Sequence, residues 1–183
     1  MNISEELVFE KKKYIIEANG GISLPAAGVV YWLALGVAGF YLEPNEWALL
    51  GFITSGLIFP LGMLLSKPLK ANLMVKTPLS SLIFPAMVSM FLIWPIIIAG
   101  YLTSISLVPL FLAIGMSLHW PAIGWMYGSR VCLIHAIIRV GLVTIIWFAL
   151  PDYRFTAIPI LVSLIYLFTI WGLKQEVRKA ASH

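Results

Sequence analysis

Charged side chains are scarce in this sequence. Of its 183 residues, 11% are charged and 61% are hydrophobic, whereas a soluble domain carries about 25% charged residues. Such a chain cannot cover its surface with polar groups, so part of its surroundings must be lipid. The composition excludes an ordinary soluble domain and indicates an integral membrane protein.

Cysteine and several common motifs are also missing. Cys132 is the single cysteine, which excludes an intramolecular disulfide framework. No glycine-rich loop that would cradle phosphate occurs, and no polar segment is long enough for an ATPase domain. The net charge of +4 comes from clusters between apolar blocks, so we expect no nucleic-acid partner.

Long uncharged segments predict six transmembrane helices, because crossing about 30 Å of hydrocarbon takes about 20 apolar residues. The longest uncharged segment, residues 77–129, would make a helix of about 80 Å and must fold back. The stretch GYLTSIS at residues 100–106 marks that reversal. The predicted spans are residues 20–42, 47–66, 79–99, 107–127, 131–150 and 155–173.

The basic residues are distributed asymmetrically about these spans. The N-terminal arm, the second and fourth connections and the tail hold ten of the 12 lysines and arginines; Arg154 lies on the other side and Arg139 inside a span. Because cytoplasmic loops retain basic residues, both termini are predicted to be cytoplasmic. The expected parts are a juxtamembrane segment (residues 1–19), a six-helix membrane domain (20–173) and a cytoplasmic tail (174–183).

The N-terminal segment mixes acids and bases and lacks an evident cleavage site, so the first span is expected to be retained rather than removed as a leader. Without other targeting features, we predict a multi-pass protein of the cell membrane, specifically a bacterial inner membrane. Prolines within the spans predict kinked helices. They are Pro60, Pro85, Pro95, Pro109, Pro121 and Pro159.

Only three ionisable side chains lie inside the predicted spans: His119, His135 and Arg139. A hairpin turning at residues 128–130 would bring His119 level with Arg139, about 15 Å from the turn. His135 lies one helical turn from Arg139 and shares its face. Trp120 and Tyr127 are expected to border the same space, which completes a candidate ligand site.

The candidate site lacks an acid. An arginine at that depth costs about 2.5–3.5 kcal/mol, and none of the six spans contains an aspartate or glutamate. The compensating group is either Glu17 at the start of the first span, or carbonyls and hydroxyls such as those of Ser117 and Tyr127, or an anion from outside the chain. Because a guanidinium matches carboxylate or phosphate geometry, the ligand alternative is an anionic solute or a lipid headgroup.

Catalysis has weaker support. Cys132 and His135 are three residues apart, but that spacing alone does not establish a nucleophile and base. Two histidines and one cysteine match no zinc-ligand pattern, and the histidines differ in depth by about 6 Å, which disfavours haem. We therefore expect no metal and no cofactor, and a membrane-embedded enzyme is the least favoured class.

Two resemblances accompany this interpretation. The stretches SGLIFPLGMLLSKPL (residues 55–69) and SLHWPAIGWMYGSR (residues 117–130) resemble an uncharacterised family of small bacterial multispanning proteins known as a domain of unknown function, which implies no activity. The stretch ALGVA (residues 34–38), with six spans, is similar to the substrate-binding subunits of energy-coupling-factor vitamin transporters. That resemblance implies that Ala34 and Ala38 dock a coupling subunit.

The sequence thus favours a small transporter, channel or binding subunit for an anionic solute or lipid headgroup, with Arg139 in the site. The alternative is a membrane interaction or regulatory subunit that does not transport. The expected partners are membrane lipid, a small anionic ligand, and other subunits of an oligomer or larger complex.

Overall fold

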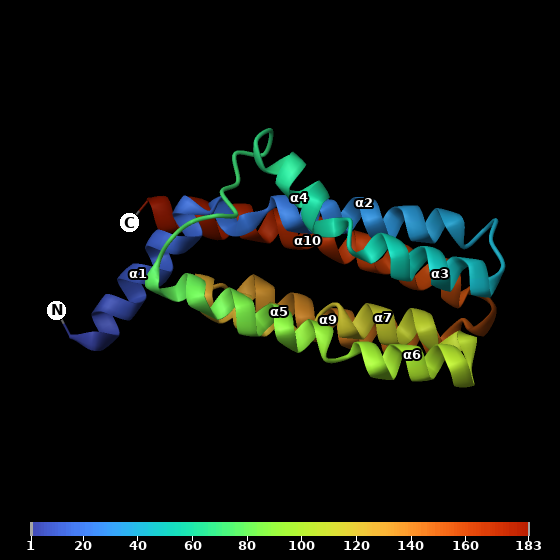
Figure 1. Cartoon of the computed structure of the whole chain (residues 1–183). Coiled ribbons are helices and arrows are strands. Elements are labelled where there is room, and N and C mark those ends of the chain that lie inside the picture. The colour runs from blue at the N-terminus through green and yellow to red at the C-terminus, as the bar shows by residue number, and fades with distance from the viewer. Residues whose placement is uncertain (1, 183) are drawn as a thin grey trace.

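The computed structural model describes residues 2–182, so Met1 and His183, the ends of the predicted terminal segments, lie outside it. The described residues form an elongated bundle of helices (Figure 1) and contain no β-strand. The all-helical prediction is confirmed.

The helices follow the predicted spans closely. The α-helices are α1 (Ile3–Glu17), α2 (Ser23–Ala38), α3 (Pro44–Ser55), α4 (Ile58–Ser66), α5 (Ile83–Phe91), α6 (Trp94–Thr103), α7 (Val108–Gly115), α8 (Trp120–Tyr127), α9 (Arg130–Ala149) and α10 (Arg154–Ala181). Short 3-10 helices connect some of them: η1 (Asn19–Gly21), η2 (Pro78–Leu82), η3 (Ile105–Leu107) and η4 (Pro151–Tyr153).

Five helical stretches are long and apolar enough to cross a membrane, and α3 with α4, bent by 48°, makes a sixth if it is counted as one span. The five are Asn19–Ala38, Pro78–Thr103, Ile105–Tyr127, Arg130–Ala149 and Pro151–Ala181. The chain therefore has the helices of a membrane protein with about six spans.

Prolines mark the interruptions of three spans. Pro60, Pro95 and Pro121 lie in the first turns of α4, α6 and α8, directly after the breaks that separate these helices from α3, α5 and α7. Proline lacks a backbone N–H and clashes with the carbonyl four residues earlier, but it is tolerated in a first turn. The predicted kink is confirmed ahead of Pro60, where α3 and α4 are bent by 48°, and the helices are interrupted ahead of Pro95 and Pro121. Pro85 and Pro109 lie in the first turns of α5 and α7, and α10 continues through Pro159.

Both predicted reversals are present. Ser104 has an extended backbone and ends α6 before η3 turns the chain back. At the other reversal, Gly128 ends α8 in the left-handed conformation with φ +61°, which glycine adopts without a steric cost. Ser129 then caps α9 by accepting a hydrogen bond from the backbone N–H of Cys132 at 3.2 Å.

The centre of the bundle is the pair of α2 and α10, which lie side by side along most of their length (Figure 1). Glycines permit this approach: a Cβ at Gly28 would lie 2.8 Å from the Tyr166 ring, and one at Gly39 would lie 2.3 Å from the Phe155 carbonyl oxygen. Small residues have the same role in other membrane helix pairs. Helices α7 and α9 pack against α10 and complete the core.

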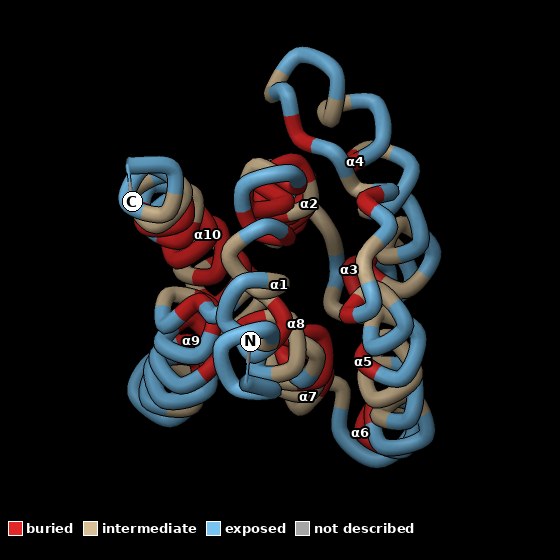
Figure 2. The backbone as a smooth tube through the Cα atoms, turned by 90° about the vertical axis from the view of Figure 1, so that its left-hand side faces the viewer, coloured by how far each residue is buried: buried red, intermediate tan, exposed pale blue. Residues whose placement is uncertain are grey.

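The third span, α5 with α6, lies at the edge of the bundle. In its most apolar 18-residue segment 11% is buried, whereas the corresponding share in the first span is 56%. Figure 2 shows the contrast, with buried residues concentrated on α2 and α10 and mostly exposed or intermediate residues along α5 and α6. This span therefore presents most of its surface to the surroundings of the bundle.

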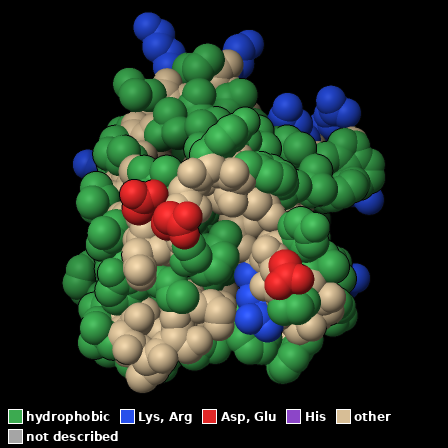
Figure 3. Space-filling view, turned by 90° about the vertical axis from the view of Figure 1, so that its right-hand side faces the viewer, with side chains coloured by type: hydrophobic (Ala, Val, Ile, Leu, Met, Phe, Trp, Pro, Cys, Tyr) green, Lys and Arg blue, Asp and Glu red, His purple; other side chains and the backbone are tan. Residues whose placement is uncertain are grey.

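The two termini lie at the same end of the bundle (Figure 1). Acidic side chains are visible at the opposite end (Figure 3), where Glu43 caps α3, Glu46 lies in its first turn and Asp152 lies in the α9–α10 connection. The predicted juxtamembrane segment forms α1 and η1, and the predicted tail continues α10 as far as Ala181. The cytoplasmic assignment of the termini stays a prediction.

Candidate functional site

Arg139 lies near the middle of α9 and is completely buried. Its Nη1 donates a hydrogen bond to the Tyr166 hydroxyl on α10 at 3.0 Å. The guanidinium carbon lies 5.0 Å from the ring centroid of Trp32 on α2 and 5.3 Å from that of Tyr166. Three helices therefore enclose this cation, and aromatic faces, which attract cations, form two of its walls.

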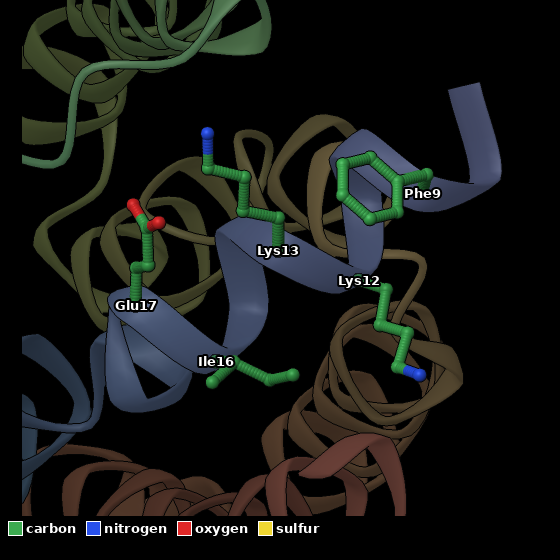
Figure 4. Close-up of a pocket in the computed structure, with 5 residues that line it drawn as sticks. All are labelled: Phe9, Lys12, Lys13, Ile16 and Glu17. Carbon is green, nitrogen blue, oxygen red and sulfur yellow. The ribbon is translucent and has the colours of Figure 1, made fainter. Parts of the chain in front are cut away.

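The remaining donors of Arg139 are unpaired. Its Nε and Nη2 have no hydrogen-bond partner among residues 2–182. Glu17, one of the expected partners, is exposed on α1, and its side chain points to the same side of α1 as Lys13 (Figure 4). Ser117 donates instead to the carbonyl of Ile114 at 2.6 Å. In the described part of the chain the charge of Arg139 thus has a hydroxyl and aromatic rings around it but no carboxylate.

His135 lies one turn before Arg139, and its hydrogen bond indicates which ring nitrogen carries the proton in the neutral ring. The Thr169 hydroxyl donates its only proton to the Ile165 carbonyl at 2.8 Å, so it can only accept from His135 Nδ1, which lies 2.7 Å away. Nδ1 therefore carries the proton of the neutral ring. His135 Nε2 is consequently a buried acceptor, and it has no partner in residues 2–182.

Trp120 and His119 extend this cluster from the start of α8. The Trp120 ring stacks on His135 with centroids 4.2 Å apart, and the His119 ring lies 5.6 Å from Trp120. The indole N–H groups of Trp120 and Trp32 and the Nδ1 of His119 are buried and unpartnered within the described residues. We call His119, Trp120, His135, Arg139, Trp32 and Tyr166 the arginine cluster.

The structure thus brings together four of the five residues that the sequence nominated: His119, Trp120, His135 and Arg139. Tyr127 lies elsewhere. Its ring packs edge-on against Tyr14 of α1 at 5.0 Å, and its hydroxyl lies beside Gly21. Seven residues of helix, about 10 Å, separate Tyr127 from Trp120.

Sequence reasoning missed three members of this environment: Trp32, Tyr166 and Thr169. The last two share a face of the sixth span at a spacing of three, so polar residues at helical spacing were an available signal. Trp32 had no such signal, because tryptophan in a span is equally typical of packing and of hydrogen bonding.

The arrangement suits binding better than covalent chemistry. Cys132 is buried, its Cβ faces the position that a Cβ on Gly124 would occupy, and its backbone N–H is held by Ser129. No group of three His, Cys, Asp or Glu residues that could hold a metal occurs in the part of the chain that the structure describes. Within the described residues the cluster offers one permanent cation, several unpaired N–H donors and two unpaired imidazole nitrogens, His135 Nε2 and His119 Nδ1.

Comparisons with known proteins identify a family but no activity. No curated protein and no solved structure matches the chain, so the likeness to vitamin-transporter subunits has no support from them. A family of unknown function, DUF7010, matches residues 9–176 and includes both stretches that resembled an uncharacterised domain. The chain belongs to the DUF7010 family.

Proposed function

We propose that this membrane protein binds an anionic group at Arg139, as a small transporter, channel or binding subunit for an anionic solute or a lipid headgroup. One observation carries the proposal: the guanidinium of Arg139 is fully buried, and two of its three nitrogens have no partner within residues 2–182. A buried charge is ordinarily paired and hydrogen-bonded.

Two donor groups of Arg139 stay without acceptors in this environment. Two aromatic faces contribute about 0.5–2 kcal/mol each to a desolvated cation, and the bond to Tyr166 contributes about 1.5–3 kcal/mol. Leaving two charged donor groups of Arg139 without acceptors costs at least about 1–3 kcal/mol each. An oxyanion would satisfy both groups at once, because a guanidinium binds carboxylate and phosphate in a bidentate manner.

The free groups also describe the ligand. The donors are Arg139 Nε and Nη2 and the indole N–H groups of Trp32 and Trp120, and His135 Nε2 is an acceptor. His119 Nδ1 is also buried and unpartnered within residues 2–182, and it donates or accepts according to its tautomer. A ligand with several acceptor oxygens and one proton, such as a singly protonated oxyanion, matches that set. A fully deprotonated anion would leave His135 Nε2 unsatisfied.

The break in the fourth span supports a binding role. His119 precedes α8 at the point where α7 and α8 separate, and the next residue, Trp120, stacks on His135. Interrupted membrane helices are typical of substrate sites near the bilayer centre, because unwound backbone is tolerated where it borders a ligand or cavity. The interruption therefore lies beside the cation.

The membrane assignment that belongs to this proposal is a bacterial inner membrane with both termini in the cytoplasm. The bundle places the two termini at one end. The basic residues of the arm, the tail and the even-numbered connections then lie on the cytoplasmic side, in accordance with the positive-inside rule.

A second candidate is a membrane interaction or regulatory subunit, and one observation favours it. On α2, Ala34 is exposed between the exposed side chains of Leu33 and Val37, with Val30 one turn earlier. Small residues on an open helix face permit close approach of a partner helix. Co-purification of a stoichiometric protein partner would favour this candidate.

The test compares the wild type with Arg139→Gln and with Arg178→Gln, which removes the same charge at an exposed position of α10. Native mass spectrometry of the purified chain reports co-purified molecules, and thermal unfolding is measured with sodium phosphate, sulfate or acetate against sodium chloride at equal ionic strength. At 100 times Kd a ligand stabilises by about 2.7 kcal/mol, which is roughly 5–10 °C in Tm for a chain of this size. We expect an adduct or such a shift in the wild type and in Arg178→Gln, and neither in Arg139→Gln.

The contrary result is equally clear. If the wild type carries no adduct, none of the three anions changes its Tm, and Arg139→Gln unfolds at a lower Tm or fails to fold without added anion, then Arg139 is a structural residue. The anion-binding proposal then fails.

A further inference from the structure

A second group of cations surrounds a hollow at the end of the bundle where the termini lie. Helix α1, the α8–α9 turn and the last turns of α10 border an open hollow of about 580 Å³. Its charged lining residues are Lys11, Lys12, Arg130, Lys179 and Glu176, and the rest of the lining is Val8, Ile15, Tyr127, Gly128 and Ala180. Figure 2 looks at this end and shows α1 beside α8, and α1 also packs against α10. We call this hollow the basic groove.

The single acid of the basic groove is already engaged. Glu176 Oε1 accepts from the backbone N–H groups of Arg130 and Val131 at 3.1 and 3.2 Å, and its Oε2 accepts from the Ser129 hydroxyl. The carboxylate therefore serves the N-terminus of α9, where an anion is favoured. It does not neutralise the four cations, whose combined positive potential stays available.

The cations are held on a docked scaffold. Lys11 Nζ lies 3.8 Å from the ring centroid of Trp125, and α1 is anchored by the buried side chains of Tyr14 and Ile15. Burial raises the pKa of the Tyr14 phenol, which stays neutral against Tyr127. Lys12 extends from α1 on the side away from Lys13 and Glu17 (Figure 4) and borders the groove.

The basic groove lies at the end of apolar spans, where a membrane boundary is expected. Arg130 begins the fifth apolar span. Trp125 lies beside the groove and is half exposed, and tryptophan is enriched at bilayer interfaces. From Arg130 the same face of α9 continues into Leu133, Ile134 and Ile137, all of which are exposed. The basic groove, whose cations surround a largely apolar lining, thus continues directly into an apolar helix face.

We propose that the basic groove binds the headgroup of an anionic phospholipid, with the phosphate among the four cations and the acyl chains along the exposed face of α9. Basic pockets at the ends of membrane helices recognise such headgroups through charge. The groove lies at the end of the bundle rather than at the Arg139 level, so this lipid site is separate from the arginine cluster.

The test measures lipid retention by the full chain in detergent with native mass spectrometry, using dioleoyl phosphatidylglycerol, dioleoyl phosphatidylcholine and inorganic phosphate as probes. The groove variant is Lys12→Gln/Arg130→Gln/Lys179→Gln. The matched control, Lys67→Gln/Lys76→Gln/Lys174→Gln, removes the same number of charges from exposed positions that do not line the groove.

We expect the wild type to retain phosphatidylglycerol over phosphatidylcholine by at least about tenfold, the groove variant to lose roughly that preference, and the control to change it less than about twofold. Equal losses in both variants would overturn the proposal in favour of general surface charge. So would equal retention of the two lipids, or displacement of the lipid by inorganic phosphate. If the groove variant unfolds, Lys179→Gln against Lys174→Gln gives the same comparison with one charge each.

Discussion

The α2–α10 pair and the α5–α6 span show opposite relations between sequence and burial. The third span is the most apolar of the five continuous spans and the least buried, whereas the first span is less apolar and more than half buried. Lipid chains are as apolar as leucine, so hydrophobicity does not drive one membrane helix against another. Contact is decided instead by the close fit of helix surfaces and by polar groups that bond across them.

The α2–α10 pair has both of these features. Gly28 and Gly39 admit the Tyr166 ring and the Phe155 carbonyl, and the Ser163 hydroxyl donates to the Val29 carbonyl at 3.1 Å. In α5–α6 the buried residues are few: Ala86, Ile97 and Gly100. The arginine cluster and the closely packed helices thus occur in the same part of the molecule.

The largest expected effect comes from breaking the close approach. A Cβ at Gly39 would lie 2.3 Å from a backbone oxygen, which cannot rotate away as a side chain would. Gly39→Ala should therefore separate the two helices and lower the free energy of unfolding by roughly 3 kcal/mol or more. Thermal unfolding in detergent measures it.

The control for this change is Gly141→Ala in α9, where a Cβ meets nothing within 4 Å. Alanine there should raise the stability by roughly 0.5–1 kcal/mol. If Gly39→Ala behaved in the same way as Gly141→Ala, the tight α2–α10 contact would be wrong.

Replacing Arg139 by an apolar residue leaves the core of the described chain without a charged side chain, as in α5–α6. Arg139→Met deletes a cation that lacks two of its partners within residues 2–182, so the ligand-free protein should gain about 1–4 kcal/mol while anion binding is lost. Tm is measured without added anion and with phosphate. A loss of Tm without anion would show that Tyr166 and the aromatic walls already compensate the charge.

Matched truncations test burial directly. Ile158 on α10 is fully buried and Ile98 on α6 is 48% exposed. Ile158→Ala should cost about 2 kcal/mol, at the low end of core substitutions because the lost contact is packing rather than transfer from water. Ile98→Ala should change the stability by less than about 0.5 kcal/mol, and equal costs would contradict the peripheral position of α6.

The smallest expected change in stability comes from removing the hydrogen bond between Arg139 on α9 and Tyr166 on α10. Tyr166→Phe removes the hydroxyl that accepts from Arg139 and should cost about 1.5 kcal/mol. In the Arg139→Met background the same change should cost almost nothing, so a double-mutant cycle reports the coupling. Equal costs in the two backgrounds would show that the hydroxyl acts through another neighbour.

Much of this fold was predictable from the sequence. About six spans, the reversals near Ser104 and Gly128 and the breaks ahead of Pro60, Pro95 and Pro121 follow from span length and backbone chemistry. These features are local, so each is determined by a few neighbouring residues.

The candidate site was predictable only in part. His119, His135 and Arg139 were identified because charge and imidazole are rare inside a span. Trp32, Tyr166 and Thr169 were not identified, because their contact with α9 depends on how α2 and α10 are rotated. Tyr127 was expected in the site because of its place in the hairpin, but it turns toward Tyr14 instead.

By itself, the sequence determined that the chain forms about six helices apolar enough to cross a membrane and where the chain reverses. It also determined that one arginine lies within an apolar span that contains no acid. Only the tertiary structure decided which spans pack together and which groups surround Arg139. The physical reason is that apolar helices in lipid present faces of similar hydrophobicity. Their contacts depend on small residues, ring shapes and hydrogen bonds, which act only when the helices meet.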